Sequence, residues 1–195
     1  MAKNRKYTLG FKRKVTKKTN YKNRLELIKS KKIRIVIRPS LNNLLVQFVE
    51  YLPNGDHVLI SIKSDHLKKL GWLAGRGNIP AAYLTGFYAG KLAKSRKIDE
   101  AILDMGHFVS SKGNRIYAAL KGVIDAGINV PCSKEILPKE DAISGVIIAN
   151  YAKKLSSDKE KHDEYFSNYI KNNLSPEKLP EHFKDIKNKI MNEVK

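Results

Sequence analysis

The chain has 195 residues, 42% of them hydrophobic, which is enough for one buried core with an appendage. It carries 38 Lys and Arg residues against 19 Asp and Glu residues, a formal net charge of +19, so a polyanion such as nucleic acid is the first candidate partner. Its single cysteine, Cys132, excludes an internal disulfide, and no stretch resembles a membrane span or a secretion signal, so we expect a cytoplasmic protein with no membrane partner.

The positive charge is concentrated at the start of the chain. Residues 1–38 contain 15 Lys and Arg residues and one acid, Glu26. Residues 1–18, the basic arm, have too few apolar side chains to form a core, so we expect them to be disordered without a partner. Cations neutralise phosphates and scattered aromatic rings stack on unpaired bases, whereas a localisation signal would need no aromatics. The arm residues predicted to contact RNA are Lys3, Arg5, Lys6, Tyr7, Phe11, Lys12, Arg13, Lys14, Lys17 and Lys18.

A capped helix is predicted after the arm, over residues 19–32. We expect Leu25 and Ile28 to face inward, and Tyr21 and Arg24 to be available on the outer side. The following residues predict three strands joined by short turns, over 33–38, 44–51 and 58–62. Apolar residues alternate in the first strand, and successive strands with short connections form an antiparallel meander.

A glycine-rich turn follows a short predicted helix over residues 65–70. Gly75 and Gly77 can adopt positive φ and admit close backbone approach, and Asn78 is a favourable N-cap for the next helix. That helix has an apolar stripe beside a nearly flat face, where Gly86 and Gly90 indicate tight packing against another element. The simplest interpretation is a central helix laid on a sheet. In addition to this structural role, the N–H groups of the turn and of the helix N-terminus could bind a phosphate.

The next elements complete the predicted sheet domain. They are a strand over 101–103, a polar turn with Lys112 and Arg115, a helix over 116–127 and a last strand over 128–130. The order βββαβα(β) predicts an α/β fold: one mixed sheet, made of the antiparallel meander plus one or two parallel strands, with helices packed on it.

The C-terminal part of the chain is predicted to be helical. Beyond Pro138, amphipathic segments cover residues 141–154, 157–172 and 175–195, and we expect Ile143, Ile147 and Tyr151 to face inward. These stripes need a docking surface, either on the sheet domain or on a partner. The expected organisation is a basic arm over 1–18, an α/β RNA-binding domain over 19–131, and a C-terminal linker with a helical extension over 132–195.

Catalytic and metal sites receive little support. The five histidines lack metal-ligand spacing, and the glycine turn lacks both the Gly-Lys-Ser/Thr of a P-loop and the third glycine of the dinucleotide fingerprint. A βββαβα order is also that of ribonuclease-H-like nucleases, whose two metal ions need converging carboxylates. Asp104 is well placed, but Glu50 and Asp125 lie on other elements. The first strand offers Arg34 and Arg38 where acids are needed. We predict no enzyme, cofactor or metal; the alternatives are a metal-dependent nuclease of this topology and a general nucleic-acid chaperone.

Several blocks of the sequence resemble one family and occur in order along the chain. They are Lys18-Thr19-Asn20-Tyr21, Gly71-Trp72, Gly77-Asn78-Ile79-Pro80-Ala81-Ala82-Tyr83-Leu84-Thr85-Gly86, Lys112-Gly113-Asn114-Arg115, Ala118-Ala119-Leu120-Lys121-Gly122, and Asp125-Ala126-Gly127 with Pro131. The family is the archaeal form of large-subunit ribosomal protein L-eighteen, whose eukaryotic relative is L-five. The resemblance runs from about residue 3 to Lys153. One departure is Ala142, where the family usually has arginine.

The resemblance implies a structural, non-enzymatic protein of the cytoplasmic large ribosomal subunit. It would bind 5S rRNA and help attach it to large-subunit rRNA in the central protuberance. The implied partners are 5S rRNA, large-subunit rRNA and neighbouring large-subunit ribosomal proteins. The family pattern places the basic arm and Thr19-Asn20-Tyr21 on RNA. Beyond the arm, the residues expected to contact RNA are Thr19, Asn20, Tyr21, Arg24, Arg38, Gly77, Asn78, Lys112 and Arg115.

Overall fold

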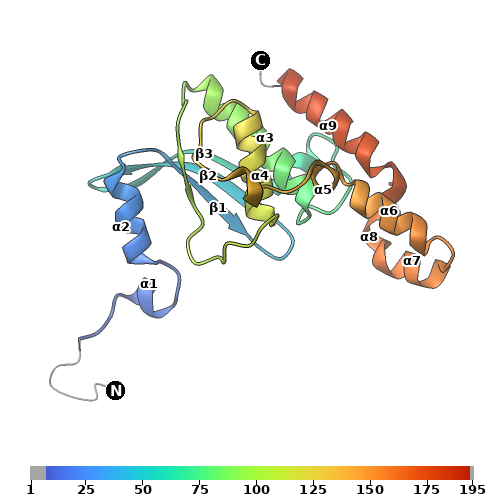
Figure 1. Cartoon of the computed structure of the whole chain (residues 1–195), viewed down its shortest axis with the longest axis horizontal. Helices are drawn as coiled ribbons and strands as arrows, with labels where there is room; N and C mark the ends of the chain where they lie inside the picture. The colour runs from blue at the N-terminus through green and yellow to red at the C-terminus, as the bar shows by residue number, and fades with distance from the viewer. Residues whose placement is uncertain (1–7, 194–195) are drawn as a thin grey trace.

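A four-stranded mixed sheet forms the centre of the molecule in the computed structural model, which describes residues 8–193 (Figure 1). Its strands are β1 (Arg34–Pro39), β2 (Leu44–Leu52), β3 (Gly55–Lys63) and β4 (Ile102–Asp104). They are ordered β3-β2-β1-β4, with antiparallel β1–β2 and β2–β3 pairs and a parallel β1–β4 pair. The predicted mixed α/β fold is confirmed.

The prediction of a further strand over 128–130 is wrong. This segment makes a single parallel bridge, between Asn129 and Glu100. Ile128 and Val130 are nevertheless buried in the core. Their apolar pattern therefore reflects packing against neighbouring elements, with almost no contribution from strand pairing.

Two helices, α3 (Ile79–Ser95) and α4 (Arg115–Asp125), cover one face of the sheet (Figure 1). Each begins at an asparagine whose side chain satisfies otherwise unpaired N–H groups of the first turn. The Oδ1 atom of Asn78 accepts a hydrogen bond from Ala81 N at 2.9 Å. Asn114 Oδ1 accepts in the same way from the first turn of α4, at 2.9 and 3.0 Å. The interpretation of α3 as a central helix laid on a sheet is confirmed.

Glycines bring α3 and α4 into close backbone contact. A Cβ atom added at Gly86 would lie 2.6 Å from the carbonyl carbon of Ala119, and one added at Gly90 would lie 2.7 Å from Ala126 Cβ. Gly122 of α4 lies equally close to the backbone of α3. The tight packing inferred from the glycines of α3 is confirmed, and its partner is α4.

The glycine-rich turn differs from its prediction in one respect. Neither Gly75 nor Gly77 has positive φ, which is found instead at Gly71, with φ 93°. A Cβ atom at Gly77 would lie 2.9 Å from the carbonyl oxygen of Leu41, whereas one at Gly75 would meet nothing closer than 3.8 Å. The close approach of the Leu41 backbone thus explains why residue 77 is a glycine. The prediction of positive φ is wrong for both Gly75 and Gly77.

Two short helices precede the sheet, α1 (Lys12–Val15) and α2 (Tyr21–Lys29). We expected no regular structure before residue 19, but α1 forms one helical turn, all of whose residues are exposed. In α2 the side chain of Asn20 caps the helix, as predicted, by accepting a hydrogen bond from Asn23 N at 3.3 Å. Leu25 was expected to face inward, but it is 56% exposed because α2 covers only a small part of the sheet.

The C-terminal part of the chain forms five helices among the described residues. They are α5 (Glu140–Ser144), α6 (Val146–Leu155), α7 (Lys159–Tyr165), α8 (Ser167–Lys171) and α9 (Leu179–Glu193). The single helix predicted over 141–154 is broken at Gly145, which has φ 84°. Because the break rotates the following residues, Ile147 and Tyr151 are exposed, whereas Ile143 is buried as expected.

Helix α9 docks on the side of α3 that faces away from the sheet. Its apolar stripe, Leu179, Phe183, Ile186 and Ile190, is buried together with Leu84 of α3. The docking surface for this stripe is therefore part of the chain itself. Short 3-10 helices occupy Ser64–Lys68, Lys134–Ile136 and Pro176–Lys178. Among residues 8–193, no helix combines the length and the apolar character that crossing a membrane requires.

A histidine helps to hold α9 in place. The ring of His182 stacks on Trp72, with centroids 5.0 Å apart, and its Nε2 atom accepts a hydrogen bond from Leu73 N at 3.2 Å. Burial lowers the pKa of His182, while nearby Asp185 opposes this shift and Lys189 adds to it. The neutral ring is therefore the form that fits the folded state.

This pKa shift predicts a loss of stability in mild acid. When folding lowers the pKa of a histidine, its contribution to stability is fully present at pH values above the unfolded-state pKa of about 6.5. This contribution is lost as the pH falls through the folded-state pKa. Thermal melts between pH 7.5 and 5 should show a steeper decline for the wild type than for His182→Gln, which can accept the same hydrogen bond without titrating. Parallel declines would contradict this role of His182.

Candidate RNA-binding surface

The face of the sheet opposite α3 and α4 carries polar and charged side chains. Residues of β1 alternate, so that Ile35 and Ile37 enter the core while Arg34 and Arg38 point to the other face. The extra residue Leu59 in β3 forms a bulge between the pairs Phe48↔Ile60 and Val49↔Val58. The extra residue shifts the alternation of β3 by one position. As a result, the side chains of Asp56 and Val58 point to the polar face of the sheet.

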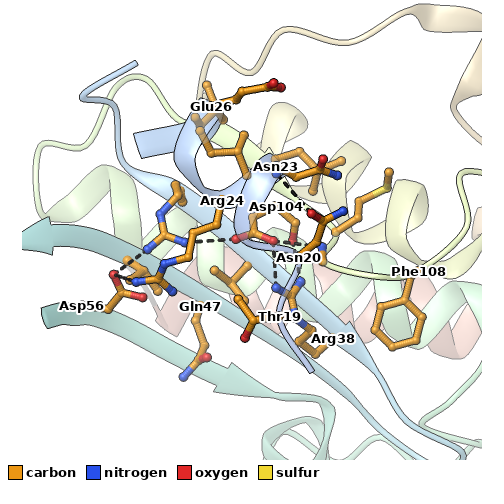
Figure 2. Close-up of a pocket in the computed structure, with 18 of the residues that line it drawn as sticks. Thr19, Asn20, Asn23, Arg24, Glu26, Arg38, Gln47, Asp56, Asp104 and Phe108 are labelled. Carbon is orange, nitrogen blue, oxygen red and sulfur yellow. Dashed lines mark hydrogen bonds and ion pairs between the residues drawn. The ribbon is translucent and has the colours of Figure 1, made fainter. Parts of the chain in front are cut away.

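Five charged side chains form an alternating network on this open face (Figure 2). Arg34 pairs with Asp56 at 2.8 Å and with Asp104 at 3.0 Å. Asp104 also pairs with Arg38 at 2.7 Å, and Asp56 with Arg24 at 2.9 Å. The Arg34 side chain is 3% exposed, so its two carboxylate partners compensate a charge that water cannot reach.

The network also fixes the loop after β4. Arg38 Nη1 donates to the carbonyl oxygen of Asp104 at 2.6 Å, and the Gly106 N–H donates to Asp104 Oδ1 at 2.9 Å. Gly106 has φ 66°, and its Cα lies against the Arg38 guanidinium, where an added Cβ would come within 3.0 Å. Asp104 therefore connects β1, β4 and the loop that carries Phe108.

A hollow of about 770 Å³ opens above this network, between α2, the sheet and the loop over residues 105–110. Five cationic side chains and three carboxylates line it. The cations are Arg13, Lys18, Arg24, Arg34 and Arg38, and the acids are Glu26, Asp56 and Asp104. Because five cations face three acids, the lining has a formal charge of +2 and favours an anionic ligand.

The structure brings part of the predicted RNA-contacting set to this hollow. Its lining includes Arg13, Lys18, Thr19, Asn20, Arg24 and Arg38. Arg24 was expected to be freely available on the outer side of α2, but it is half-buried because it pairs with Asp56. Tyr21 lies outside the lining and packs its ring 5.3 Å from that of Phe11. Lys12, Lys14 and Lys17 are exposed, whereas Lys3, Arg5, Lys6 and Tyr7 lie outside the described residues.

The other predicted residues gather at the N-termini of α3 and α4. Arg115 Nη1 donates to the carbonyl oxygens of Ser40 and Gly77, both at 3.1 Å, and so ties two loops to α4. The side-chain oxygen of Asn78 is engaged as the cap of α3. Lys112 is exposed on the turn before α4. Asn78 and Arg115 thus both have structural roles. The capping role of Asn78 was expected from the sequence, whereas the role of Arg115 in holding two loops was not.

Sequence reasoning missed several residues of the hollow. Asn23, Gln47 and Phe108 line it, and Asp56 completes its ion-pair network. The alternation of β1 could have indicated that Arg34 and Arg38 share a face. Asp56 could not have been found in this way, because the bulge in β3 changes which residues of that strand face the hollow.

The acids considered for a nuclease do not converge. Both oxygens of Asp104 pair with arginines, Asp125 accepts a hydrogen bond from Tyr83 at 2.8 Å and pairs with Lys121, and Glu50 is exposed. Within residues 8–193, no three His, Cys, Asp or Glu side chains are grouped so that they could hold a metal ion.

Comparison with protein families identifies a match over most of the chain. The model of the family described as "Ribosomal large subunit proteins 60S L5, and 50S L18" matches residues 5–100 and 90–133. The matched range contains the whole sheet, α1 to α4 and the hollow, and the C-terminal helices lie beyond it.

Proposed function

The chain belongs to this family of large-subunit ribosomal proteins, and we propose that it binds 5S rRNA and helps to attach it to large-subunit rRNA in the central protuberance. Its role there is structural and non-enzymatic. The observation that carries the proposal is the hollow on the open sheet face, with cations around a paired network and a basic arm leading into it.

The charge distribution supports RNA as the partner on this face. Phosphate contacts from Lys and Arg supply most of the affinity for nucleic acid, and the first 38 residues contain 15 of these cations. Arg13 reaches the hollow from α1, Lys18 from the loop that follows α1, and Arg38 from β1. Polar amides between them suit the irregular, unpaired regions that proteins read in RNA.

Neighbouring large-subunit proteins are the proposed partners of the opposite end of the molecule. Helices α6 to α8 lie far from α1 and α2 (Figure 1). Their surface exposes Ile147, Tyr151 and Tyr165, which suits contact with protein better than contact with phosphate.

A competition experiment tests the proposed function. Labelled 5S rRNA bound to the full chain should be displaced by unlabelled 5S rRNA and resist an equal concentration of unrelated duplex RNA. Equal displacement by both would favour a general nucleic-acid chaperone. Incubation of structured RNA with the protein and Mg²⁺ should leave the RNA intact, and cleavage would favour the nuclease alternative.

Removal of the basic arm should weaken the salt dependence of this binding. If the arm makes roughly four phosphate contacts, deleting residues 2–18 should reduce the slope of log K against log salt by about three units. The melting temperature of the free protein should barely change, since residues 8–18 are exposed. A salt titration and a melt of both proteins check this. An unchanged slope would place the arm away from the RNA.

A further inference from the structure

The hollow on the open sheet face has the dimensions and walls of a site for a small group. Its volume of about 770 Å³ falls within the range of about 300–1,000 Å³ that is typical of small-ligand sites. Helix α2 bounds one side, the loop over 105–110 bounds the other, and β1 and β2 form the floor (Figure 2). The bases of an A-form duplex are stacked between two backbones, so they could not enter between these walls.

The lining offers contacts for both a base and a phosphate. Asn23 presents an amide that can both donate to and accept from a base edge. Asn20 can donate through its amide nitrogen while its oxygen caps α2, and Gln47 can accept through its oxygen while its nitrogen donates to Ser61. The side chain of Arg38 is 34% exposed while Asp104 holds its guanidinium in place. Phe108 follows two residues after the glycine that packs on Arg38, and 43% of its surface is exposed. An exposed aromatic ring in a polar wall is the feature on which unpaired bases stack.

We propose that the hollow receives one unpaired nucleotide of the bound RNA, with its base stacked on Phe108 and its phosphate beside Arg38. This inference rests on the proposed RNA-binding function and adds the kind of RNA element that is recognised. The arginine–aspartate network acts as a rigid floor with three arginines to two aspartates, so that Asp56 and Asp104 are both paired and the floor does not repel the phosphate. Because only an unpaired nucleotide can enter the hollow, the protein would recognise a bulge or a loop of the RNA and not a continuous duplex.

Two neighbouring residues provide a matched test. Phe108→Ala should weaken 5S rRNA binding about five- to 150-fold, the range expected for loss of one stacked base. Val109→Ala should leave it within twofold, because Val109 is 81% exposed and lies outside the hollow. Stacking releases no counterions, so Phe108→Ala should keep the wild-type salt slope, whereas Arg38→Gln should reduce it by about one unit. Equal affinities of the two alanine variants would overturn the proposal.

A second variant distinguishes insertion into the hollow from stacking on its outer edge. Val36→Phe enlarges a side chain of the floor between Arg34 and Arg38 and should fill the space for the base. We expect at least a fivefold loss of affinity with little change in melting temperature. Wild-type affinity for Val36→Phe would overturn insertion. If the wild type shows no preference for 5S rRNA, the proposed function fails. The affinities of the same variants for the RNA that the wild type does bind would then test the insertion of a nucleotide separately.

Discussion

Replacing Gly122 with alanine is expected to destabilise the protein by at least about 3 kcal/mol, at the upper end of the usual cost of overpacking a core. The added Cβ atom would lie 2.7 Å from Phe87 N and even closer to the carbonyl oxygen of Tyr83, and real Cβ atoms essentially never come within 3.0 Å of another heavy atom. Because both neighbours are backbone atoms of α3, the two helices would have to separate.

The sign of the effect makes this test informative. In a helix without such contacts, glycine to alanine stabilises by about 1 kcal/mol, so a large loss can arise only from the contact between the helices. Gly75→Ala is the matched control, because its Cβ would meet nothing closer than 3.8 Å and its φ is not positive. Thermal or urea unfolding of both variants checks the prediction. A Gly122→Ala protein as stable as the control would show that α3 and α4 are not packed so closely.

The sequence predicted the elements of this fold best where the signal was local. The isoleucine alternation of β1 and the asparagine caps of α2 and α3 depend on residues a few positions apart, and the structure confirms them. Gly145 shows the limit of this reasoning. Its left-handed conformation breaks one predicted helix into two and turns Ile147 outward, although the apolar spacing of the segment suits a continuous helix.

The hollow was less predictable because its parts are distant in sequence. Arg34 and Asp104 are 70 positions apart, and they meet only because β4 pairs with β1 in parallel. Hydrophobic periodicity shows that Arg34 lies opposite the isoleucines, but it does not show that a helix and a loop bury the arginine. The charge of the basic arm indicated RNA without indicating the surface that would receive it.

Removing the charge of Asp104 should be the most damaging change on the open face of the sheet. Asp104→Asn keeps the shape of the side chain but places an uncharged amide between Arg34 and Arg38. Arg34 is 2% exposed, its Nη1 and Nη2 atoms contact Asp104 and Asp56, and its Nε atom is buried without a hydrogen-bond partner among the described residues, so its charge depends on the two carboxylates. Breaking a buried ion pair costs about 3–5 kcal/mol, and because Asp56 remains we expect about 3 kcal/mol.

A loss of this size should lower the melting temperature by roughly 6–12 °C in a chain of this length. Glu100→Ala is the control, since it removes the exposed pair between Glu100 and Lys32 and should change stability by less than about 1 kcal/mol. Arg34→Met should cost less than Asp104→Asn, because Asp104 keeps Arg38 and Asp56 keeps Arg24 as partners when the buried cation is removed. The prediction would be contradicted if Asp104→Asn had the melting temperature of the wild type while Arg34→Met was unfolded. Arg34 would then stabilise the protein through packing, and its charge would not require the carboxylate of Asp104.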